Sequence, residues 1–126
     1  MKINIFGSTG IIGSKTLDII NNYFPSIKIN LLCSNTNVKK LIKQIEIYSP
    51  KYVYLNDLTK IHLLKKNINK NISILNFNEL KSYLANSKSD YTLLAISGYK
   101  SLNYLEHILN NTESLGLVSK EAIVSA

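Results

Sequence analysis

The amino-acid sequence predicts an α/β fold: a Rossmann-like, doubly wound, mostly parallel sheet with helices on both faces. Short strand-like runs alternate with helix-like runs, which is the pattern of parallel strands joined by helical crossovers. The first strand-like run leads into a glycine-rich turn, Gly7–Gly13 (GSTGIIG), and then into a helix-like run. A chain of 126 residues with 45% hydrophobic and 18% charged residues fits one domain.

The first part of the chain shows the clearest periodicity. The first strand is expected over Lys2–Phe6, where isoleucines alternate with Lys2 and Asn4. A helix follows the glycine turn and ends near Asn21–Pro25, and a β-branched, aliphatic strand follows at Ile27–Cys33. The next helix, stopped by Pro50, has apolar residues at i, i+3, i+4 and i+7, namely Val38, Leu41, Ile42 and Ile45. Its wet face carries Lys39, Lys40, Lys43 and Glu46.

The later elements follow the same alternation. They are expected as a strand at Tyr52–Leu55, a weaker helix at Asp57–Lys66, a strand at Ser73–Leu75 and a helix around Asn78–Leu84. Asp57 is a plausible N-cap, and Ile61 and Leu64 are expected on the buried side of its helix. The nearly continuous apolar run Tyr91–Ile96 predicts a buried central strand. After it come a helix carrying Leu102, Leu105 and Leu109 and a strand at Leu115–Val118.

Composition argues against several classes of protein. The formal charge is +7, but all 15 basic residues are scattered lysines, and arginine is the preferred reader of guanine edges, so nucleic-acid binding is not expected. A basic surface can still steer a phosphorylated ligand. No apolar run approaches the roughly 20 residues of a membrane-spanning helix, and the chain is expected to have no signal peptide. The single Cys33 suits a reducing cytoplasm and is expected to be a small buried hydrophobe.

The glycine turn has the composition of a phosphate-binding loop. Gly7 would allow a tight turn, Gly10 would let a pyrophosphate approach the backbone, and Gly13 would let the helix pack closely. The helix N-terminus would offer N–H groups to an anion, and Ser8 and Thr9 could add hydroxyl donors. The GxxGxxG spacing is a weak signal that an ordinary turn could also give. Its strand–loop–helix–strand context favours a dinucleotide, and a Walker-type loop is disfavoured because no Lys-Ser/Thr pair follows.

The end of the second strand bears on which dinucleotide is bound. Cys33–Asn37 reads CSNTN and lacks the carboxylate that NAD-specific sites place there for the ribose hydroxyls. Hydroxyl and amide donors with Lys39 and Lys40 nearby favour NADP. Asn35 and Asn37 could instead form a turn and cap the next helix, and both roles can coexist. No metal or catalytic constellation is visible, since His62 and His107 are far apart in the sequence and the carboxylates are dispersed.

Four segments together resemble a known family. They are GSTGIIG at 7–13, NTNV at 35–38, AISG at 95–98 and SKEAIVSA at 119–126. In this order and spacing they are similar to the N-terminal, NADPH-binding domain of the 1-deoxy-D-xylulose 5-phosphate reductoisomerase family. Members of that family typically read GSTGSIG in the loop and Asn-Lys-Glu-Ser near the last segment.

The resemblance implies a role for each matching residue. Thr9, Gly10, Ile11 and Ile12 would wrap the pyrophosphate, and Asn35, Thr36 and Asn37 would lie at the adenosine 2′-phosphate. Ser119 and Glu121 would lie on the nicotinamide side, and Lys120 would contact the sugar-phosphate substrate. The family rearranges this substrate and reduces the aldehyde with NADPH, giving 2-C-methyl-D-erythritol 4-phosphate for isoprenoid synthesis.

The resemblance also implies what lies beyond this sequence. The family needs Mg2+ or Mn2+, whose Lewis-acid role is to polarise substrate oxygens. The metal ligands, the catalytic and C-terminal domains and most of the homodimer interface are expected outside residues 1–126, so this fragment alone is expected to be inactive. Three positions depart from the family pattern: Ile11 replaces serine, Thr36 replaces a basic residue and Ser119 replaces asparagine. The alternative is a non-catalytic dinucleotide-binding module or truncated remnant.

Overall fold

The computed structural model describes residues 2–69, 71–86, 91–95 and 115–117. The strands are β1 (Lys2–Phe6), β2 (Lys28–Ser34), β3 (Tyr52–Leu55), β4 (Ser73–Leu75), β5 (Tyr91–Leu94) and β6 (Leu115–Leu117). The helices are α1 (Ile11–Tyr23), α2 (Val38–Tyr48), the 3-10 turn η1 (Leu58–Lys60), α3 (Ile61–Asn67) and α4 (Phe77–Asn86). The expected helix carrying Leu102, Leu105 and Leu109 lies outside the described residues, as do Ile96, Val118 and His107.

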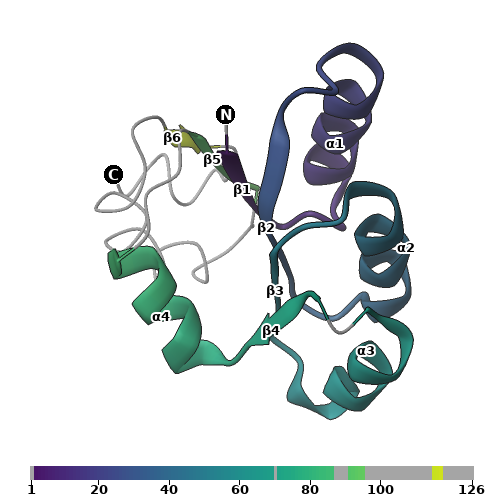
Figure 1. Cartoon of the computed structure of the whole chain (residues 1–126), viewed down its shortest axis with the longest axis vertical. Helices are drawn as coiled ribbons and strands as arrows, with labels where there is room; N and C mark the ends of the chain where they lie inside the picture. The colour runs from purple at the N-terminus through teal and green to yellow at the C-terminus, as the bar shows by residue number, and fades with distance from the viewer. Residues whose placement is uncertain (1, 70, 87–90, 96–114, 118–126) are drawn as a thin grey trace.

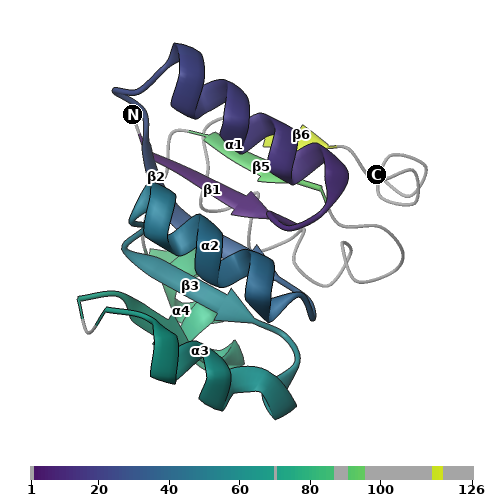
Figure 2. The ribbon, with the colours of Figure 1, turned by 90° about the vertical axis from the view of Figure 1, so that its right-hand side faces the viewer.

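The strands form one sheet in the order β4-β3-β2-β1-β5-β6, and every neighbouring pair is parallel. The chain first builds outward from β1 to β4 and then returns to place β5 on the other side of β1 (Figures 1 and 2). The predicted parallel sheet is confirmed. The strand order reverses between β1 and β5, and in open α/β sheets ligands bind at the carboxyl ends of the strands beside such a reversal.

Helices cover both faces of the sheet, as predicted. α1, α2 and α3 lie on one face and α4 on the other (Figure 1). On the first face Leu17, Leu41 and Leu64 pack against strand residues such as Ile5 and Val53. On the second face Leu80 and Leu84 of α4 pack in a separate cluster. Its strand members are Phe6, Leu31, Cys33, Tyr54, Leu75 and Leu94. The buried Cys33 is thus a core residue, as expected.

The alternation in β1 does not produce one apolar face and one wet face. Asn4 is completely buried, because α4 covers the face that its side chain shares with Phe6. Its amide nitrogen donates to Thr92 Oγ1 at 3.5 Å, and its oxygen accepts from the Tyr83 hydroxyl at 2.8 Å. These bonds offset the desolvation of a polar group in the core.

The boundaries of two elements differ from expectation for local reasons. The segment expected as one helix at Asp57–Lys66 is η1 followed by α3. Asp57 caps η1, as expected of an N-cap, by accepting from the Thr59 N–H at 3.0 Å. α2 ends at Tyr48, and Ser49 turns into the left-handed region at φ 46°, just before Pro50. The predicted strands at Tyr52–Leu55 and Ser73–Leu75 match β3 and β4.

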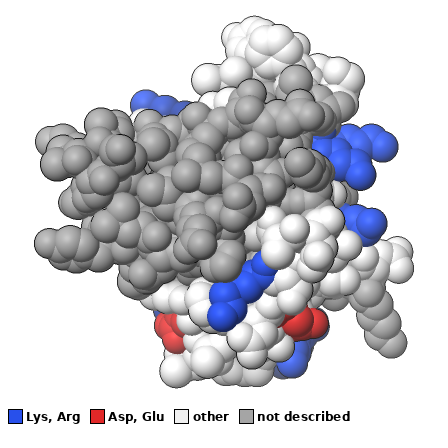
Figure 3. Space-filling model, turned by 90° about the vertical axis from the view of Figure 1, so that its left-hand side faces the viewer, with Lys and Arg blue, Asp and Glu red and all other residues white. Residues whose placement is uncertain are grey.

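The described surface bears lysines in several separate places. Figure 3 shows them on the face seen from the left of Figure 1, where they do not join into one stripe on the described part. Within the described ranges, no helix has both the length and the apolar character that crossing a membrane requires.

Candidate dinucleotide-binding site

The glycine loop leaves the carboxyl end of β1 beside the reversal of strand order and enters α1 (Figure 2). Its start is tied to β2, because the N–H groups of Gly7 and Ser8 both donate to the Cys33 carbonyl, at 2.9 and 3.1 Å. Ala95, the residue after β5, donates its N–H to Phe6 O at 2.9 Å. The loop is therefore bonded to β2, and the end of β1 from which it leaves is bonded to the residue that follows β5.

Each glycine of the loop has a different local environment. Gly7 has a φ of 82°, which side-chain-bearing residues rarely adopt. A Cβ at Gly13 would lie 2.2 Å from the Gly7 carbonyl oxygen and 2.9 Å from the Ser8 Cα, so only glycine lets α1 approach the loop this closely. A Cβ at Gly10 would lie 3.4 Å from the same oxygen, an ordinary contact. The backbone conformation therefore requires glycine at position 7 and packing requires it at position 13, whereas neither requires Gly10.

The N-terminus of α1 is open. Gly10 is its N-cap residue, and no side chain caps it within the described structure. The N–H groups of the first turn have no carbonyl one turn earlier inside the helix, and the helix dipole adds partial positive charge there. Ile11 is 75% exposed and Ile12 is 45% exposed, so the surface around these N–H groups is accessible. This geometry can receive a phosphate.

The two hydroxyl residues of the loop face the protein. Ser8 is fully buried, and its hydroxyl has no hydrogen-bond partner among the described residues. The Ser8 carbonyl accepts from Gln44 Nε2 at 2.8 Å and from Ser14 Oγ at 3.2 Å. Thr9 Oγ1 lies 2.8 Å from Ser34 Oγ at the end of β2. The expected donation of these two hydroxyls to a cofactor stays a prediction.

Gln44 is a site-supporting residue that sequence reasoning missed. It lies on the buried face of α2 beside Ile45 and is itself buried. The sequence did contain a signal for it: Gln44 is a polar residue on the otherwise apolar face of an amphipathic helix, between Leu41 and Ile45. Its bond to the Ser8 carbonyl links the glycine loop to α2.

The turn after β2 is held by its own polar groups. Asn37 caps α2, since its Oδ1 accepts from the Lys40 N–H at 3.2 Å. Asn35 Oδ1 accepts from Asn56 Nδ2 at 3.0 Å. The Thr36 carbonyl accepts from the Lys60 ammonium at 3.1 Å. The expectation that Asn37 caps the next helix is confirmed, and Lys60 is a neighbour that the sequence pattern did not indicate.

The other residues considered as site candidates either lie on another element or fall outside the described residues. His62 is exposed on α3. Ser119, Lys120 and Glu121 fall outside the described residues. Within the described part of the chain, no three His, Cys, Asp or Glu side chains gather in a way that could hold a metal ion.

Two ionisable groups near the site are shifted in opposite directions. Burial in the core cluster on the α4 face raises the pKa of the Cys33 thiol well above its usual value, so the thiol stays protonated. Hydrogen bonds from the Thr59 hydroxyl and N–H lower the pKa of Asp57, and nearby Lys60 lowers it further. Asp57 is therefore a carboxylate at neutral pH.

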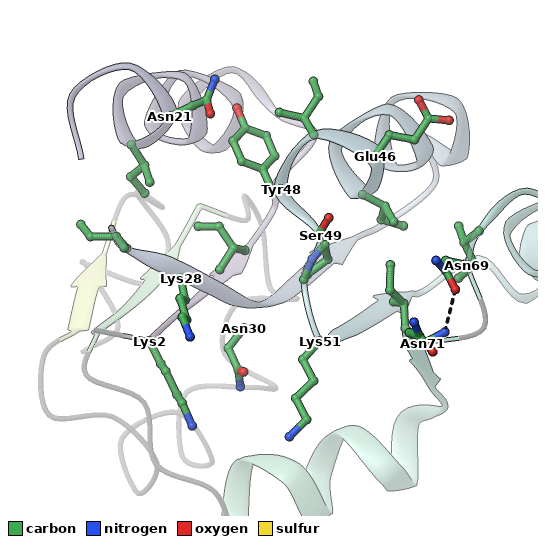
Figure 4. A pocket seen from close by; sticks show the side chains of 18 of the residues that line it. Lys2, Asn21, Lys28, Asn30, Glu46, Tyr48, Ser49, Lys51, Asn69 and Asn71 are labelled. Atoms are coloured by element: carbon green, nitrogen blue, oxygen red, sulfur yellow. Dashed lines mark hydrogen bonds between the residues drawn. The ribbon is translucent and has the colours of Figure 1, made fainter. Parts of the chain in front are cut away.

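A groove away from the glycine loop also lies in the described structure. It has a volume of about 990 Å³ and lies at the amino ends of β1 to β4, opposite the glycine loop. Lys2, Lys28 and Lys51 extend in one direction along its edge (Figure 4). Ligands of open parallel sheets bind at the carboxyl ends of the strands, so this groove is not the candidate site.

The parallel sheet, the reversal beside β1 and the open glycine loop define a Rossmann-like α/β domain. The model of the family described as 1-deoxy-D-xylulose 5-phosphate reductoisomerase matches residues 3–126. This chain belongs to that family.

Individual relatives agree with the family match. The chain is 39% identical to the 1-deoxy-D-xylulose 5-phosphate reductoisomerase of Pelagibacter ubique, over 98% of this chain and 32% of the relative. It is 33% identical to that of Thermoanaerobacter pseudethanolicus, over 99% of this chain and 33% of the relative. The chain thus spans about a third of the length of the curated relatives it matches.

A solved structure has the same fold. The reductoisomerase from Zymomonas mobilis in complex with NADPH superposes with a TM-score of 0.84 at 26% identity, covering 99% of this chain and 33% of that one. A second reductoisomerase, in complex with NADPH, fosmidomycin and magnesium, reaches a TM-score of 0.85 at 23% identity, over 98% of this chain and 31% of that one. At 23% identity, this second similarity supports only a shared fold.

Proposed function

We propose that residues 1–126 form the NADPH-binding domain of a 1-deoxy-D-xylulose 5-phosphate reductoisomerase. The whole enzyme would isomerise and reduce 1-deoxy-D-xylulose 5-phosphate to 2-C-methyl-D-erythritol 4-phosphate for isoprenoid biosynthesis. The observation that carries this proposal is the open, glycine-lined N-terminus of α1 at the reversal of strand order, in a chain of this family. The complex of the similar Zymomonas mobilis reductoisomerase with NADPH supports NADPH as the cofactor.

The loop would hold the cofactor's pyrophosphate through its backbone. The N–H groups of Ile11, Ile12 and Gly13 begin α1 and would donate to phosphate oxygens. Gly10 is extended and lacks a side chain, so it would let the pyrophosphate lie against the main chain. The replacement of a family serine by Ile11 removes a hydroxyl and leaves the N–H in place. When bound, NADPH supplies the hydride that reduces the rearranged aldehyde.

The turn after β2 would bind the adenosine end. All three of Asn35, Thr36 and Asn37 are exposed. The Asn37 oxygen is used in capping α2, so its Nδ2 group is the part that would donate to a 2′-phosphate. The absence of a carboxylate from this turn favours NADPH over NADH.

The remaining parts of the proposal concern the whole protein. Ser119 and Glu121 would lie on the nicotinamide side, and Lys120 would contact the sugar phosphate. The described residues offer no cluster of metal ligands, so the Mg2+ or Mn2+ that the family uses would be held by residues beyond those described. We also propose a cytoplasmic homodimer without nucleic-acid or membrane partners, and the free, buried Cys33 is consistent with a reducing compartment.

Titration with NADPH and NADH, followed by cofactor fluorescence, tests the binding proposal. We expect NADPH to bind at least about tenfold more tightly, the size of one charge-assisted hydrogen bond. Equal affinities would contradict the NADP assignment, and no binding of either would contradict the cofactor site. For the whole protein, oxidation of NADPH should require both 1-deoxy-D-xylulose 5-phosphate and Mg2+. A protein that binds NADPH without this turnover would be the non-catalytic module.

A further inference from the structure

Lys60 lies beside the turn at which the adenosine 2′-phosphate is proposed to bind. It ends η1, in the connection from β3 to α3, and its ammonium donates to the Thr36 carbonyl at 3.1 Å. The turn itself supplies only hydroxyl and amide groups. Building on the proposed function, we propose that Lys60 is the residue that selects NADPH over NADH, by pairing with the adenosine 2′-phosphate.

The position of Lys60 is fixed by bonds between two connections. β2 and β3 are neighbouring parallel strands, so the segments after them leave the same edge of the sheet. Asn56 N donates to the Ser34 carbonyl at 3.0 Å, and Asp57 N donates to the Asn35 carbonyl at 2.9 Å. The side chains of Asn35 and Asn56 add a third bond. These bonds hold η1 against the turn.

The ammonium retains capacity for a phosphate. It has three N–H donors, and the Thr36 carbonyl takes one. The Asp57 carboxylate is 4.0 Å away, beyond hydrogen-bond range, and is itself bonded by Thr59 Oγ1 at 2.6 Å and Thr59 N at 3.0 Å. The Lys60 side chain is 42% exposed, so a ligand at the turn can reach it.

Neighbouring Asp57 opposes this function of Lys60. Its charge partly offsets that of Lys60 and repels a 2′-phosphate. Asp57→Asn removes the repulsion and keeps a side chain that can cap η1. We therefore expect opposite effects of substitutions at two residues whose charged groups are 4.0 Å apart: weaker NADPH binding for Lys60→Met and tighter binding for Asp57→Asn.

The test measures dissociation constants for NADPH and NADH, with adenosine 2′,5′-bisphosphate and 5′-AMP as fragments with and without the 2′-phosphate. Lys60→Met should weaken NADPH and the bisphosphate by about tenfold and leave NADH and 5′-AMP unchanged. Lys65→Met, an exposed lysine in the last turn of α3, is the matched control and should change none of them. Lys60→Arg should keep the preference.

Thr36→Lys in the Lys60→Met background tests whether weaker NADPH binding results from the loss of positive charge or from a change in the structure of the turn. Restoring a cation at the turn should recover most of the NADPH affinity. If neither dinucleotide binds the unsubstituted protein, the proposed function fails and this inference fails with it. If the unsubstituted protein prefers NADPH and Lys60→Met keeps that preference, this inference alone is overturned. Equal weakening of NADPH and NADH would also overturn it, since it would indicate only a disturbed turn.

Discussion

The hydroxyl of Tyr83 donates a hydrogen bond of 2.8 Å to the amide oxygen of Asn4, joining α4 to the central strand β1. The same hydroxyl accepts from Asn30 Nδ2 in β2. Asn30 is the extra residue of an irregularity in the β1–β2 register, where Ile3 pairs with Ile29 but Asn4 pairs with Leu31. The extra residue lets Asn30 reach Tyr83 while Leu31 stays in the α4 core. Burial raises the pKa of Tyr83, so the phenol remains a neutral donor.

Tyr83→Phe tests this polar link. Removal of the hydroxyl takes one partner from the buried Asn4 oxygen and should lower the free energy of unfolding by about 1–3 kcal/mol. Urea unfolding measures the change. Tyr48→Phe is the control, because its hydroxyl makes an exposed 3.4 Å bond to Asp18 and its loss should change stability by less than about 0.5 kcal/mol. Equal losses of unfolding free energy in both variants would show that the buried bond of Tyr83 contributes no more to stability than the exposed bond of Tyr48.

Gly13→Ala and Gly10→Ala should separate folding from binding. The added Cβ at Gly13 would lie 2.2 Å from backbone that cannot move aside, so we expect a loss of at least about 3 kcal/mol of stability. The Cβ at Gly10 would meet the Gly7 oxygen at 3.4 Å, so the fold should persist. Under the proposed function, Gly10→Ala should instead weaken dinucleotide binding. Unfolding curves and NADPH titration of both variants measure these effects, and normal stability for Gly13→Ala would contradict the close packing of α1.

Substitutions of Asn37 should distinguish its two roles. Asn37→Ala removes the cap of α2 and should cost about 1 kcal/mol of stability. Asn37→Asp keeps an equally good cap, so stability should be retained. If Asn37 also faces a 2′-phosphate, the new carboxylate should weaken NADPH and spare NADH. Thermal unfolding and the two titrations measure these effects, and unchanged NADPH affinity in Asn37→Asp would leave Asn37 with a capping role alone.

Cys33 should be inert in the folded protein and reactive in the unfolded one. Burial raises its pKa and blocks access to the sulfur, so alkylation by iodoacetamide should be slow until denaturant is added. The pKa of the Cys33 thiol is higher in the folded than in the unfolded protein. The thiol therefore contributes to folding stability below the ordinary thiol pKa, and this contribution declines above it because the unfolded thiol ionises first. Rapid alkylation without denaturant would contradict a closed core around β2.

The sequence determined the fold class because periodicity and turn residues act locally. Apolar spacing identified α2, and β-branched runs identified β2 and β3, with boundaries close to those observed. The glycines identified the loop, because the need for a positive φ at Gly7 and for a missing Cβ at Gly13 is visible in residue type alone. The segments at 7–13, 35–38, 95–98 and 119–126 indicated the family, and the family match agrees.

Only the tertiary structure decided which polar groups meet. Asn4 looks like a solvent-facing residue in an alternating strand, but helices on both faces bury it with Tyr83, 79 positions away. Gln44 bonds to Ser8 across 36 positions, and Lys60 reaches Thr36 across 24. Such contacts depend on the parallel sheet, which brings the carboxyl ends of β1, β2 and β3 to one edge. The spacing of residues in the sequence reveals local periodicity, whereas the order of the strands in the sheet determines which distant residues become hydrogen-bond partners.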